Sequence, residues 1–305
     1  MRSRKQFPFH IIVFLAPAVL IYSVFMVYPL LDTLGLSLRS SARTGNMFVG
    51  LENYRLLLTD PQWSERLWNA VGNNFLFFAV HMLVQNPIGL LLAALLSSRV
   101  VRFKAFFRTA LFLPTILSIV LVGFIWRLIL SPLWGISADA LDLVGLGSLN
   151  RPWLGLEGTA LVTLSLVSVW QYIGIPMLLF LAALLGIPEE LDEAARVDGA
   201  TAWQTFWRIR FPLVLPTVGV VGVLTFVANF NAFDLIYTTQ RALAGPNFST
   251  DILGTFFFRT FFGVQLQTGD PVMGATVAGV MFLIIMLGVL IYFFGFARRV
   301  RSFEL

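Results

Sequence analysis

The sequence has no cysteine, only two histidines and few charged residues. Without cysteine, neither a disulfide framework nor a thiolate metal site can form. His10 and His81 both lie in apolar stretches, so a histidine-based metal site or a Ser-His-Asp triad would rest on a single histidine. Charged residues make up 12% of the 305 residues and hydrophobic residues 58%, whereas soluble domains average about 25% charged and about 45–50% apolar. These shortages argue against an enzyme, predict no metal site, and favour a membrane protein.

A phosphate-binding loop is also missing. The pattern G-x-x-x-x-G-K-[ST] does not occur, and no glycine is followed by lysine anywhere in the chain. We therefore expect no cofactor on this chain, and any step driven by ATP would need a separate subunit. The net charge of +5 could indicate nucleic acid in a soluble protein, but these basic residues flank apolar stretches, so no nucleic-acid partner is expected.

Six apolar stretches are each long enough to cross about 30 Å of hydrocarbon as a helix. The predicted spans are approximately residues 11–30, 75–98, 109–126, 159–185, 211–233 and 271–297. None contains Asp, Glu, Lys or Arg, as the cost of charge in hydrocarbon requires. The first run is longer than a signal-peptide core and is interpreted as a retained anchor. The sequence predicts an all-α integral membrane protein, one domain over residues 1–305, in contact with membrane lipid.

The distribution of basic residues predicts the orientation of these spans. Placing both ends of the chain in the cytoplasm puts 13 of the 21 Lys and Arg residues inside, in the shorter segments. The positive-inside rule therefore favours cytoplasmic termini. The segments 31–74, 127–157 and 234–270 then lie outside, with a short surface helix expected over residues 51–59.

The cytoplasmic segment 188–212 between the fourth and fifth spans begins with the signals of a helix. Pro188 suits a first helical position, four acids follow it in the first turn, and Asp192 is expected to pair with Arg196 four residues later. Gly199 suits the left-handed residue that ends such a helix. These residues predict a short, charged helix that stops at a glycine turn.

A second helix is expected directly after the turn. Thr201 and Gln204 have the spacing of a capping box. The helix should stop before Pro212, because a residue that precedes proline, here Phe211, is disfavoured in helical geometry. The segment is thus a helical hairpin, and from spacing alone it could be a simple connector between spans.

The residues of this hairpin resemble the EAA loop found in the permeases of binding-protein-dependent ABC importers. Glu193-Ala194-Ala195, then Gly199 after three residues and Ile209 and Pro212 farther on, match that loop, and the stretch 192–200 is similar to its carbohydrate-type branch, which includes the maltose and glycerol-3-phosphate importer permeases. Phe211 stands where the motif usually has leucine. Residues 48–54, 107–114 and 233–237 extend the similarity, whereas residues 238–246 around Arg241 depart from the family's compact outer loop.

The resemblance implies a set of partners and roles. Such permeases work with a second homologous permease, a cytoplasmic ATPase dimer that binds the ATP, and an extracytoplasmic solute-binding protein, in a bacterial-type inner membrane. The EAA hairpin docks in a groove of the ATPase, with its glutamate paired to a basic residue. The expected ATPase-coupling residues are Glu193, Ala194, Ala195, Asp198, Gly199, Ile209 and Pro212.

Polar and aromatic residues within the spans are candidates for the substrate path, because polar groups in a membrane face a bundle interior or water. The candidates on spans four and five are Gln171, Tyr172, Asn229, Phe230, Asn231 and Phe233. Span two adds His81, Gln85 and Asn86, with His81 interpreted as a contact between helices. Gly174 and Pro176 are expected to loosen span four. The alternative for all these polar groups is hydrogen bonding between helices.

The predicted function is the membrane-spanning subunit of an ABC importer for a sugar or oligosaccharide. Uptake of glycerol 3-phosphate or another polyol phosphate is the alternative, for which Arg127 and Arg241 are the outer arginines to consider. An ion-coupled carrier is disfavoured because no carboxylate lies inside the predicted spans. An intramembrane enzyme is disfavoured because neither histidine has a carboxylate partner in the membrane.

Overall fold

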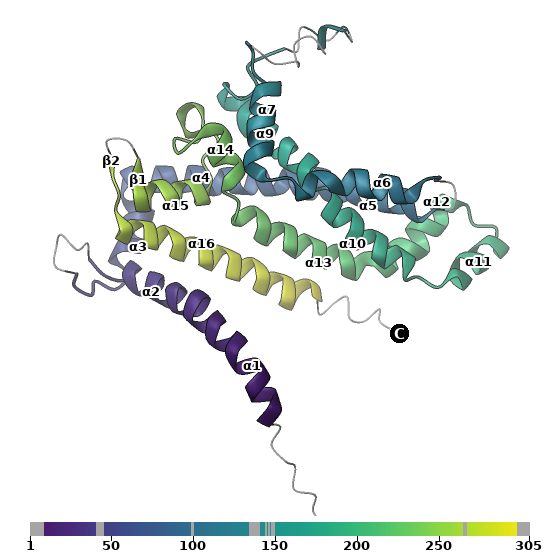
Figure 1. The fold of residues 1–305 in the computed structure, drawn as a ribbon, viewed down its shortest axis with the longest axis horizontal. Coiled ribbons are helices and arrows are strands. Elements are labelled where there is room, and N and C mark those ends of the chain that lie inside the picture. The colour runs from purple at the N-terminus through teal and green to yellow at the C-terminus, as the bar shows by residue number, and fades with distance from the viewer. Residues whose placement is uncertain are drawn as a thin grey trace, which may run out of the picture.

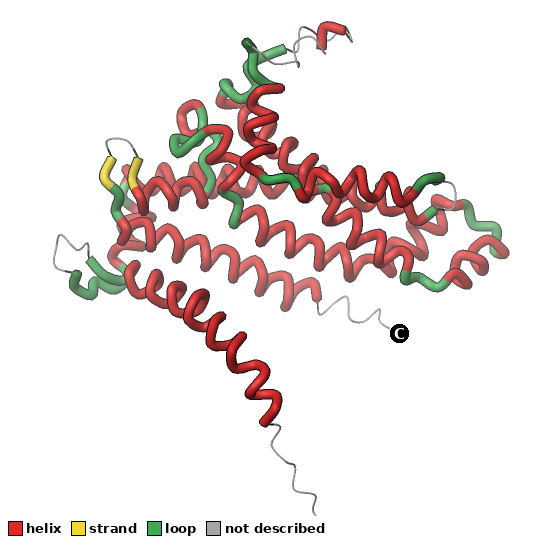
Figure 2. The backbone as a smooth tube through the Cα atoms, viewed as in Figure 1, coloured by secondary structure: helices red, strands yellow, loops and turns green. Residues whose placement is uncertain are grey.

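The computed structural model describes residues 9–40, 46–98, 101–133, 141–143, 145, 147, 150–264 and 267–297. Figure 1 shows an elongated bundle of helices with one arm at the N-terminus that leaves the body. Within the described residues the regular structure is helical apart from one two-stranded antiparallel pair and one isolated bridge between Arg39 and Phe48. Figure 2 shows the strand pair at one end of the bundle. The prediction of an almost entirely helical protein is therefore confirmed.

The N-terminal arm is one continuous helix made of α1 (Phe9–Tyr22), a π-helical turn η1 (Ser23–Val27) and α2 (Tyr28–Ser37). Its C-terminal end is held by α3 (Glu52–Thr59), where the Asn53 amide donates to the carbonyls of Ser37 at 2.7 Å and Arg39 at 2.8 Å. The short helix expected over residues 51–59 is thus confirmed. The side chains from Val13 to Leu30 are exposed in the isolated chain, although they are strongly apolar.

The second long helix runs without interruption through α4 (Pro61–Val80), a π-helical turn η3 (His81–Gln85) and α5 (Asn86–Ser97). It begins fourteen residues before the predicted span at 75, so residues 61–74 are helix and not loop. The start is set locally: the Asp60 side chain accepts a hydrogen bond from the Gln62 amide at 2.9 Å, and Pro61 occupies the first turn, where its missing N–H costs nothing.

The third predicted span is not one straight helix. It consists of α6 (Lys104–Phe112), a 3₁₀ turn η4 (Leu113–Ile116) and α7 (Ile119–Ile129), bent by 95°. Pro114 cannot donate to the helical ladder, and Leu117 and Ser118 adopt extended backbone angles. Neighbouring Gln171 braces the break, because its side-chain amide donates to the Leu117 carbonyl at 3.2 Å.

The fourth predicted span is also bent, as Gly174 and Pro176 predict. It is formed by α9 (Glu157–Tyr172) and α10 (Gly174–Leu185), which meet at 45°. Gly174 also allows a close approach: a Cβ atom at this position would lie 2.9 Å from the Phe112 Cα and 3.0 Å from the Leu111 carbonyl oxygen. The backbone of α6 therefore packs directly against the bend of this span.

The second half of the chain contains the hairpin, two long helices and the segment that joins them. Its elements are α11 (Glu189–Val197), α12 (Ala202–Thr205), the π-helical turn η6 (Phe206–Arg210), α13 (Phe211–Phe230), α14 (Asp234–Gln240), the 3₁₀ turn η7 (Pro246–Phe248), α15 (Leu253–Phe262), β1 (Gly263–Val264), β2 (Gln267–Thr268), α16 (Pro271–Ile291) and the π-helical turn η8 (Tyr292–Ala297). Asp270 caps α16 by accepting from the amides of Val272 and Met273, both at 3.1 Å.

The apolar core of the described residues lies in three clusters along the bundle. One includes Phe77, Leu164 and Ile236, from α4, α9 and α14. A second is centred on Phe230 and Phe256, and a third is formed by apolar side chains of α5, α10 and α13. Together these clusters hold the long helices side by side.

In the described part of the chain, four helices are long and apolar enough to cross a membrane. The number rises to six if each bent pair counts as one span. The coarser prediction, an integral membrane protein built of helices, agrees with this range.

Candidate coupling hairpin and transport cavity

The first helix of the hairpin, α11, ends as its sequence predicts. Gly199 has a φ of +76°, in the left-handed region. The Gly199 amide donates to the Arg196 carbonyl at 3.1 Å, and the Ala200 amide donates to the Ala195 carbonyl at 2.9 Å. These two bonds form a Schellman motif, which closes the last turn of the helix. Pro188 precedes the helix as its N-cap, so the first helical residue is Glu189.

The second helix begins with the predicted capping box. The Gln204 amide donates to the Thr201 hydroxyl at 3.3 Å, and the Thr201 amide donates to the Gln204 side-chain oxygen at 2.8 Å. Two backbone donors at the start of the helix are thereby satisfied.

The helix does not stop at Phe211, and that prediction was wrong. Arg210 and Phe211 keep helical backbone angles, and the helix continues through Pro212 into α13. The π-helical turn η6 lies directly before the proline, with the Phe211 amide bonded to the Phe206 carbonyl. A wider turn of this kind accommodates a residue that has no N–H to donate. Residues 202–230 therefore form one continuous helix.

An ion pair joins the two arms of the hairpin. The Arg210 guanidinium on η6 donates from Nε to Asp192 Oδ1 at 3.0 Å and from Nη2 to Asp192 Oδ2, and the two side chains are 27% and 20% exposed. Hydrogen bonding from Arg210 holds the pKa of the Asp192 carboxyl below its usual value. The predicted pairing of Asp192 with Arg196 was wrong. Arg196 lies on the exposed side of α11, where it donates weakly to the Asp192 backbone carbonyl at 3.4 Å and lies 3.9 Å from Glu193.

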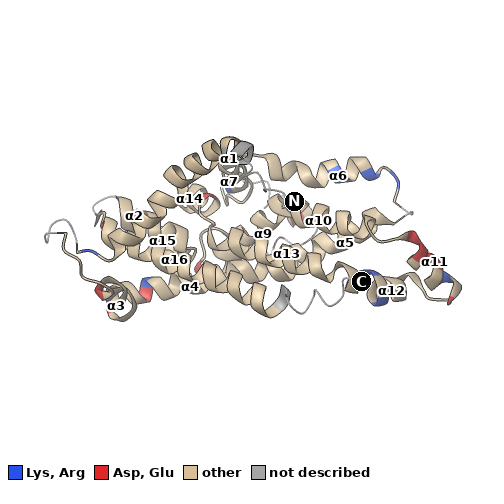
Figure 3. Ribbon diagram, turned by 90° about the horizontal axis from the view of Figure 1, so that it is seen from below, with Lys and Arg blue, Asp and Glu red and all other residues tan. Residues whose placement is uncertain are grey.

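Most of the predicted coupling residues lie on the outer surface of this hairpin. Glu193, Ala194, Asp198 and Gly199 are exposed, Ile209 and Pro212 are half-buried, and Ala195 is buried. Large apolar side chains that would ordinarily be covered lie beside them, since Val197 is 87% exposed and Trp203 is 71% exposed. Figure 3 shows the acids of α11 and the basic residues of η6, which follows α12, together at one end of the molecule. The hairpin therefore presents a charged and apolar surface that the other described residues leave uncovered.

A cavity of about 490 Å³ lies near the middle of the bundle, between α4, η3, α9, α10, α13 and α14. Four of the predicted path residues line it: Tyr172, Asn229, Asn231 and Phe233. Helix α13 ends at Phe230, so Asn231 and Phe233 belong to the short break between α13 and α14 and not to a span. This break forms part of the cavity wall.

Two further path candidates, Gln171 and Phe230, are fully buried away from the cavity wall. Gln171 supports the bend of the third span, as described above. Phe230 packs in an aromatic cluster, with ring centroids 5.1 Å from Phe75 and 4.5 Å from Phe226. The structure therefore gives these two residues packing contacts.

Of the polar residues of the second span, some line the cavity and some form hydrogen bonds between helices. His81 bridges α4 and α9, because its Nε2 lies 2.9 Å from the Ser168 hydroxyl while Nδ1 bonds the Phe77 carbonyl at 2.8 Å. Its predicted contact between helices is thus confirmed, although it also lines the cavity. Gln85 lines the cavity too, whereas Asn86 donates to the Thr225 hydroxyl on α13 at 3.2 Å.

Asp234 is a cavity residue that the sequence alone did not indicate. It lies in the first turn of α14, is exposed, and lines the cavity. Its only signal in the sequence was its position after Phe233, in a stretch similar to other permeases. Arg127 and Arg241, the two arginines considered for a phosphate, do not line the cavity.

The segment around Arg241 is anchored by a buried arginine. Arg259 on α15 forms an ion pair with Asp251, at 2.6 Å between Nη2 and Oδ2, and donates to the Ala242 carbonyl at 3.0 Å. Both side chains are almost fully buried. Arg241 itself has a φ of +61°, one of several left-handed residues in this segment. The departure from the family pattern is therefore an ordered structure with its own anchor.

With the hairpin and the cavity placed, the chain can be compared with known proteins. Residues 85–302 match the family described as binding-protein-dependent transport system inner membrane component. The chain belongs to this family. The permease is 32% identical over 255 residues to the arabinooligosaccharides transport system permease protein AraP of Bacillus subtilis, covering 84% of this chain and 79% of AraP. It is 30% identical over 289 residues to the lactose transport system permease protein LacF of Rhizobium radiobacter, covering 95% and 94% of the two chains.

The fold of the permease is also found in a solved structure. A chain in the crystal structure of a bacterial ABC transporter involved in the import of the acidic polysaccharide alginate matches with a TM-score of 0.76 at 22% identity, covering 97% of this chain and 96% of that chain. The resemblance to carbohydrate-type ABC importer permeases that the sequence motifs indicated is confirmed.

Proposed function

We propose that the permease is one of two membrane subunits that form the translocation path of an ABC importer for a sugar or oligosaccharide. In this proposal it crosses the inner membrane of a bacterial-type cell six times, with each bent helix pair counting as one span and both termini in the cytoplasm. The chain has no catalytic step of its own and no cofactor, because ATP is bound and hydrolysed by a separate ATPase dimer.

One observation carries the proposal: the second arm of the hairpin and a wall of the cavity are the same helix. Residues 202–230 run without a break from the capping box to Asn229, a length of about 43 Å at 1.5 Å per residue. A displacement of the hairpin by an ATPase would therefore move the cavity wall directly. The Asp192–Arg210 ion pair fixes α11 to this helix, so the hairpin moves as one element.

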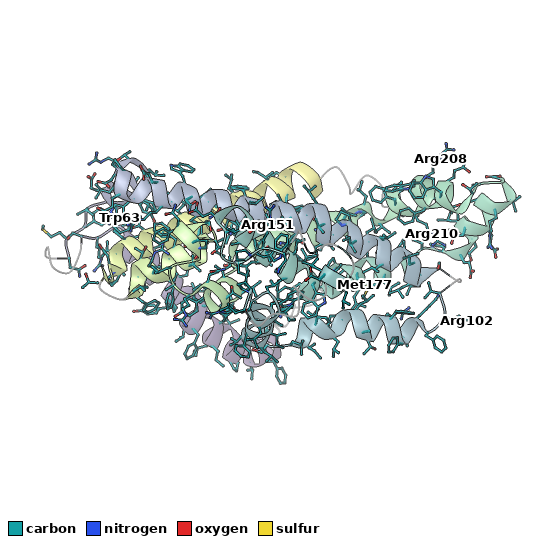
Figure 4. The ribbon with its side chains drawn as sticks, turned by 90° about the horizontal axis from the view of Figure 1, so that it is seen from above. Trp63, Arg102, Arg151, Met177, Arg208 and Arg210 are labelled. Atoms are coloured by element: carbon teal, nitrogen blue, oxygen red, sulfur yellow. The ribbon has the colours of Figure 1, made fainter. Side chains whose placement is uncertain are left out.

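The charges along the bundle support the proposed orientation. Arg102, Arg208 and Arg210 lie at the same end of the molecule, as Figure 4 shows, and Trp63 lies toward the opposite end. The positive-inside rule then places the hairpin in the cytoplasm, where an ATPase can reach it. The expected contact residues are Glu193, Asp198 and the exposed apolar side chains beside them.

The exposed arm Val13–Leu30 supports a second membrane subunit. An apolar helix that leaves the body of its own chain can be covered by lipid on one side and by a homologous permease on the other. The solute-binding protein would meet the opposite end of the bundle, where the segment anchored by Asp251 and Arg259 lies. The names of AraP and LacF, which refer to oligosaccharides and lactose, favour a saccharide substrate.

The cavity suits such a substrate. Its volume lies within the range of small-molecule sites, about 300–1,000 Å³. Amides of Gln85, Asn229 and Asn231 supply donors and acceptors for hydroxyl groups, and Tyr172 and Phe233 supply rings. A polyol phosphate remains the second candidate, but it would be expected to meet a basic residue, and none of the described wall residues is Lys or Arg.

Uptake by the complete importer tests the proposal. Reconstituted with a second permease, the ATPase and the binding protein, the permease should support ATP-dependent sugar uptake, and alone it should show neither transport nor ATP hydrolysis. Asn229→Leu should lower uptake roughly 5- to 150-fold without loss of assembly, because a lost polar contact costs about 1–3 kcal/mol. Among the described residues, the Asn229 side-chain amide bonds only the Thr225 carbonyl of its own helix, at 2.7 Å.

Asn69→Leu is the matched control, because the Asn69 amide donates to the Phe248 carbonyl at 2.9 Å, away from the cavity. Normal uptake in Asn229→Leu, or an equal loss in Asn69→Leu, would remove Asn229 from the path. Turnover by the permease alone would overturn its role as a subunit.

A further inference from the structure

Asp234 is an acid at the transport cavity without a partner. It lines the cavity at the break between α13 and α14, and its side chain is exposed. Within the described residues, its carboxylate takes part in no ion pair and accepts no hydrogen bond. Tyr172 on α9 lines the same cavity. A full negative charge therefore faces the space where a solute would pass.

The surroundings do not neutralise this charge. No Lys or Arg is among the described wall residues, and Arg127 on α7, the helix packed against α14, is exposed and lies outside the wall. His81 is the other titratable group of the wall besides Tyr172. A neutral imidazole satisfies its contacts, with Nδ1–H donating to the Phe77 carbonyl and Nε2 accepting from the Ser168 hydroxyl.

The two helix ends at the break nearly cancel each other. The C-terminal end of α13, at Phe230, contributes a partial negative charge, and the N-terminal end of the short α14 contributes a partial positive charge, each of roughly half an elementary charge at most. The carboxylate of Asp234 is thus the net charge of this part of the wall.

We propose that Asp234 gives the cavity a negative potential that selects for neutral or cationic saccharides and against solutes that carry carboxylate, sulfate or phosphate groups. Asp234 is then a specificity-determining residue of the permease. The inference rests on the proposed function, because it assumes that this cavity is part of the path. It deepens that function by naming the charge class of the substrate.

The absence of cysteine from the sequence allows a direct measurement of the potential. Ala228 on α13 lines the cavity and is exposed, so Ala228→Cys introduces a single thiol there. The purified full-length permease would be treated in separate reactions with a cationic reagent, trimethylammonioethyl methanethiosulfonate, and an anionic reagent, sulfonatoethyl methanethiosulfonate. In each, the thiolate attacks the thiosulfonate sulfur, forms a mixed disulfide and releases methanesulfinate.

The ratio of the two rates reports the local potential, because any change in the thiolate fraction affects both reagents equally. The ratio of the cationic to the anionic rate should be on the order of tenfold higher for the Ala228→Cys thiol than for free 2-mercaptoethanol, because a cleft lined by negative charge concentrates cations. Asp234→Asn should remove most of this preference, and Asp234→Glu should retain it. Raising the salt concentration should reduce the preference in the parent protein.

Glu157→Gln is the matched control, because Glu157 is also an acid in the first turn of a helix, α9, but does not line the cavity. It should leave the ratio unchanged. Two results would overturn the inference. One is the same rate ratio in Ala228→Cys with and without Asp234→Asn, and the other is a ratio in Ala228→Cys equal to that of the free thiol at every salt concentration. Neither result bears on sugar uptake by the complete importer, which tests the proposed function separately.

Discussion

The ion pair between Asp192 and Arg210 should determine how rigidly the coupling hairpin is attached. Asp192→Asn or Arg210→Gln removes one charge and keeps the approximate shape of the side chain. The intact pair has two parallel hydrogen bonds between charged groups, with the side chains only 20% and 27% exposed. Hydrogen bonds to charged groups contribute about 1.5–3 kcal/mol, and exposed ion pairs about 0.2–1 kcal/mol. A partly covered pair should fall between these limits, at about 1–2 kcal/mol.

Amide hydrogen exchange on α11 measures this quantity locally, without requiring reversible unfolding of the membrane protein. A loss of about 1–2 kcal/mol should raise the opening equilibrium of residues 191–198 roughly 5- to 30-fold, because each 1.4 kcal/mol is about a factor of ten. The double variant Asp192→Arg, Arg210→Asp, in which the acid and the base swap positions, should recover part of the protection against hydrogen exchange. The amides of α16, which lie outside the hairpin and its ion pair, should be unchanged.

Glu193→Gln is the control for this experiment, because it removes an acid from the same helix. Its ionic contact with Arg196 is 3.9 Å long, with both side chains more than 60% exposed, so it should change the exchange of α11 less than about twofold. Equal protection of α11 in Asp192→Asn and in the unmodified protein would show that the hairpin is held by other contacts. The reasoning about a rigid hairpin would then be refuted.

Two further predictions follow from local features. Because pairing lowers the pKa of Asp192 in the folded hairpin, the pair stabilises it above the ordinary pKa of about 3.9, and this contribution is lost as the pH falls through the lowered value. Exchange of α11, corrected for its intrinsic rate, should therefore be constant from about pH 8 to pH 5 and increase only below about pH 4, and this increase should be absent in Asp192→Asn. Gly174→Ala should lower the thermal stability of the detergent-solubilised permease by about 1–3 kcal/mol, because its Cβ would meet the Phe112 backbone at 2.9 Å. Gly72→Ala, in open space on α4, should be neutral or stabilise by up to about 1 kcal/mol, and an equal effect of both changes in a melting experiment would contradict the close approach.

The features that the sequence predicted correctly depend on neighbouring residues. The turn at Gly199, the capping box of Thr201 and Gln204, and the bend at Gly174 each follow from the conformational preference of one residue or from bonds within four residues. Hydropathy also indicated that the chain is built of apolar helices long enough to cross a membrane. Such local rules required no knowledge of how the helices pack.

The features that could not be predicted from the sequence depend on contacts between distant segments. Arg210 is 18 residues from Asp192 and reaches it only because the hairpin folds back, so the nearer Arg196 was the natural choice from spacing. The 95° bend near Pro114 lies within a uniformly apolar run and is braced by Gln171, 54 residues away from Leu117. Hydropathy does not register such a bend, because both of its arms are apolar.

The residues of the cavity wall were also predicted only in part. The rule that polar groups in a span face a path or a neighbouring helix identified Asn229 and Tyr172, which line the cavity, and Gln171, which does not. The rule cannot separate these outcomes, because adjacent residues on a helix point in different directions. Asp234 was missed because it lies just beyond the apolar run that defined the span.

The most direct test of the central claim, that the hairpin couples this permease to an ATPase, is co-purification of the ATPase with hairpin variants, with sugar uptake measured in the same cells. Glu193→Lys reverses an exposed charge at the expected contact, and a like-charge contact at an interface can cost several kcal/mol. Gly199→Val opposes the left-handed turn at φ +76° and so misdirects the second helix. Both variants should reach the membrane in normal amounts, and both should lose uptake, with the ATPase released or retained without coupling. Full retention of the ATPase together with normal uptake in both variants would contradict the claim and leave the hairpin as a connector between two helices.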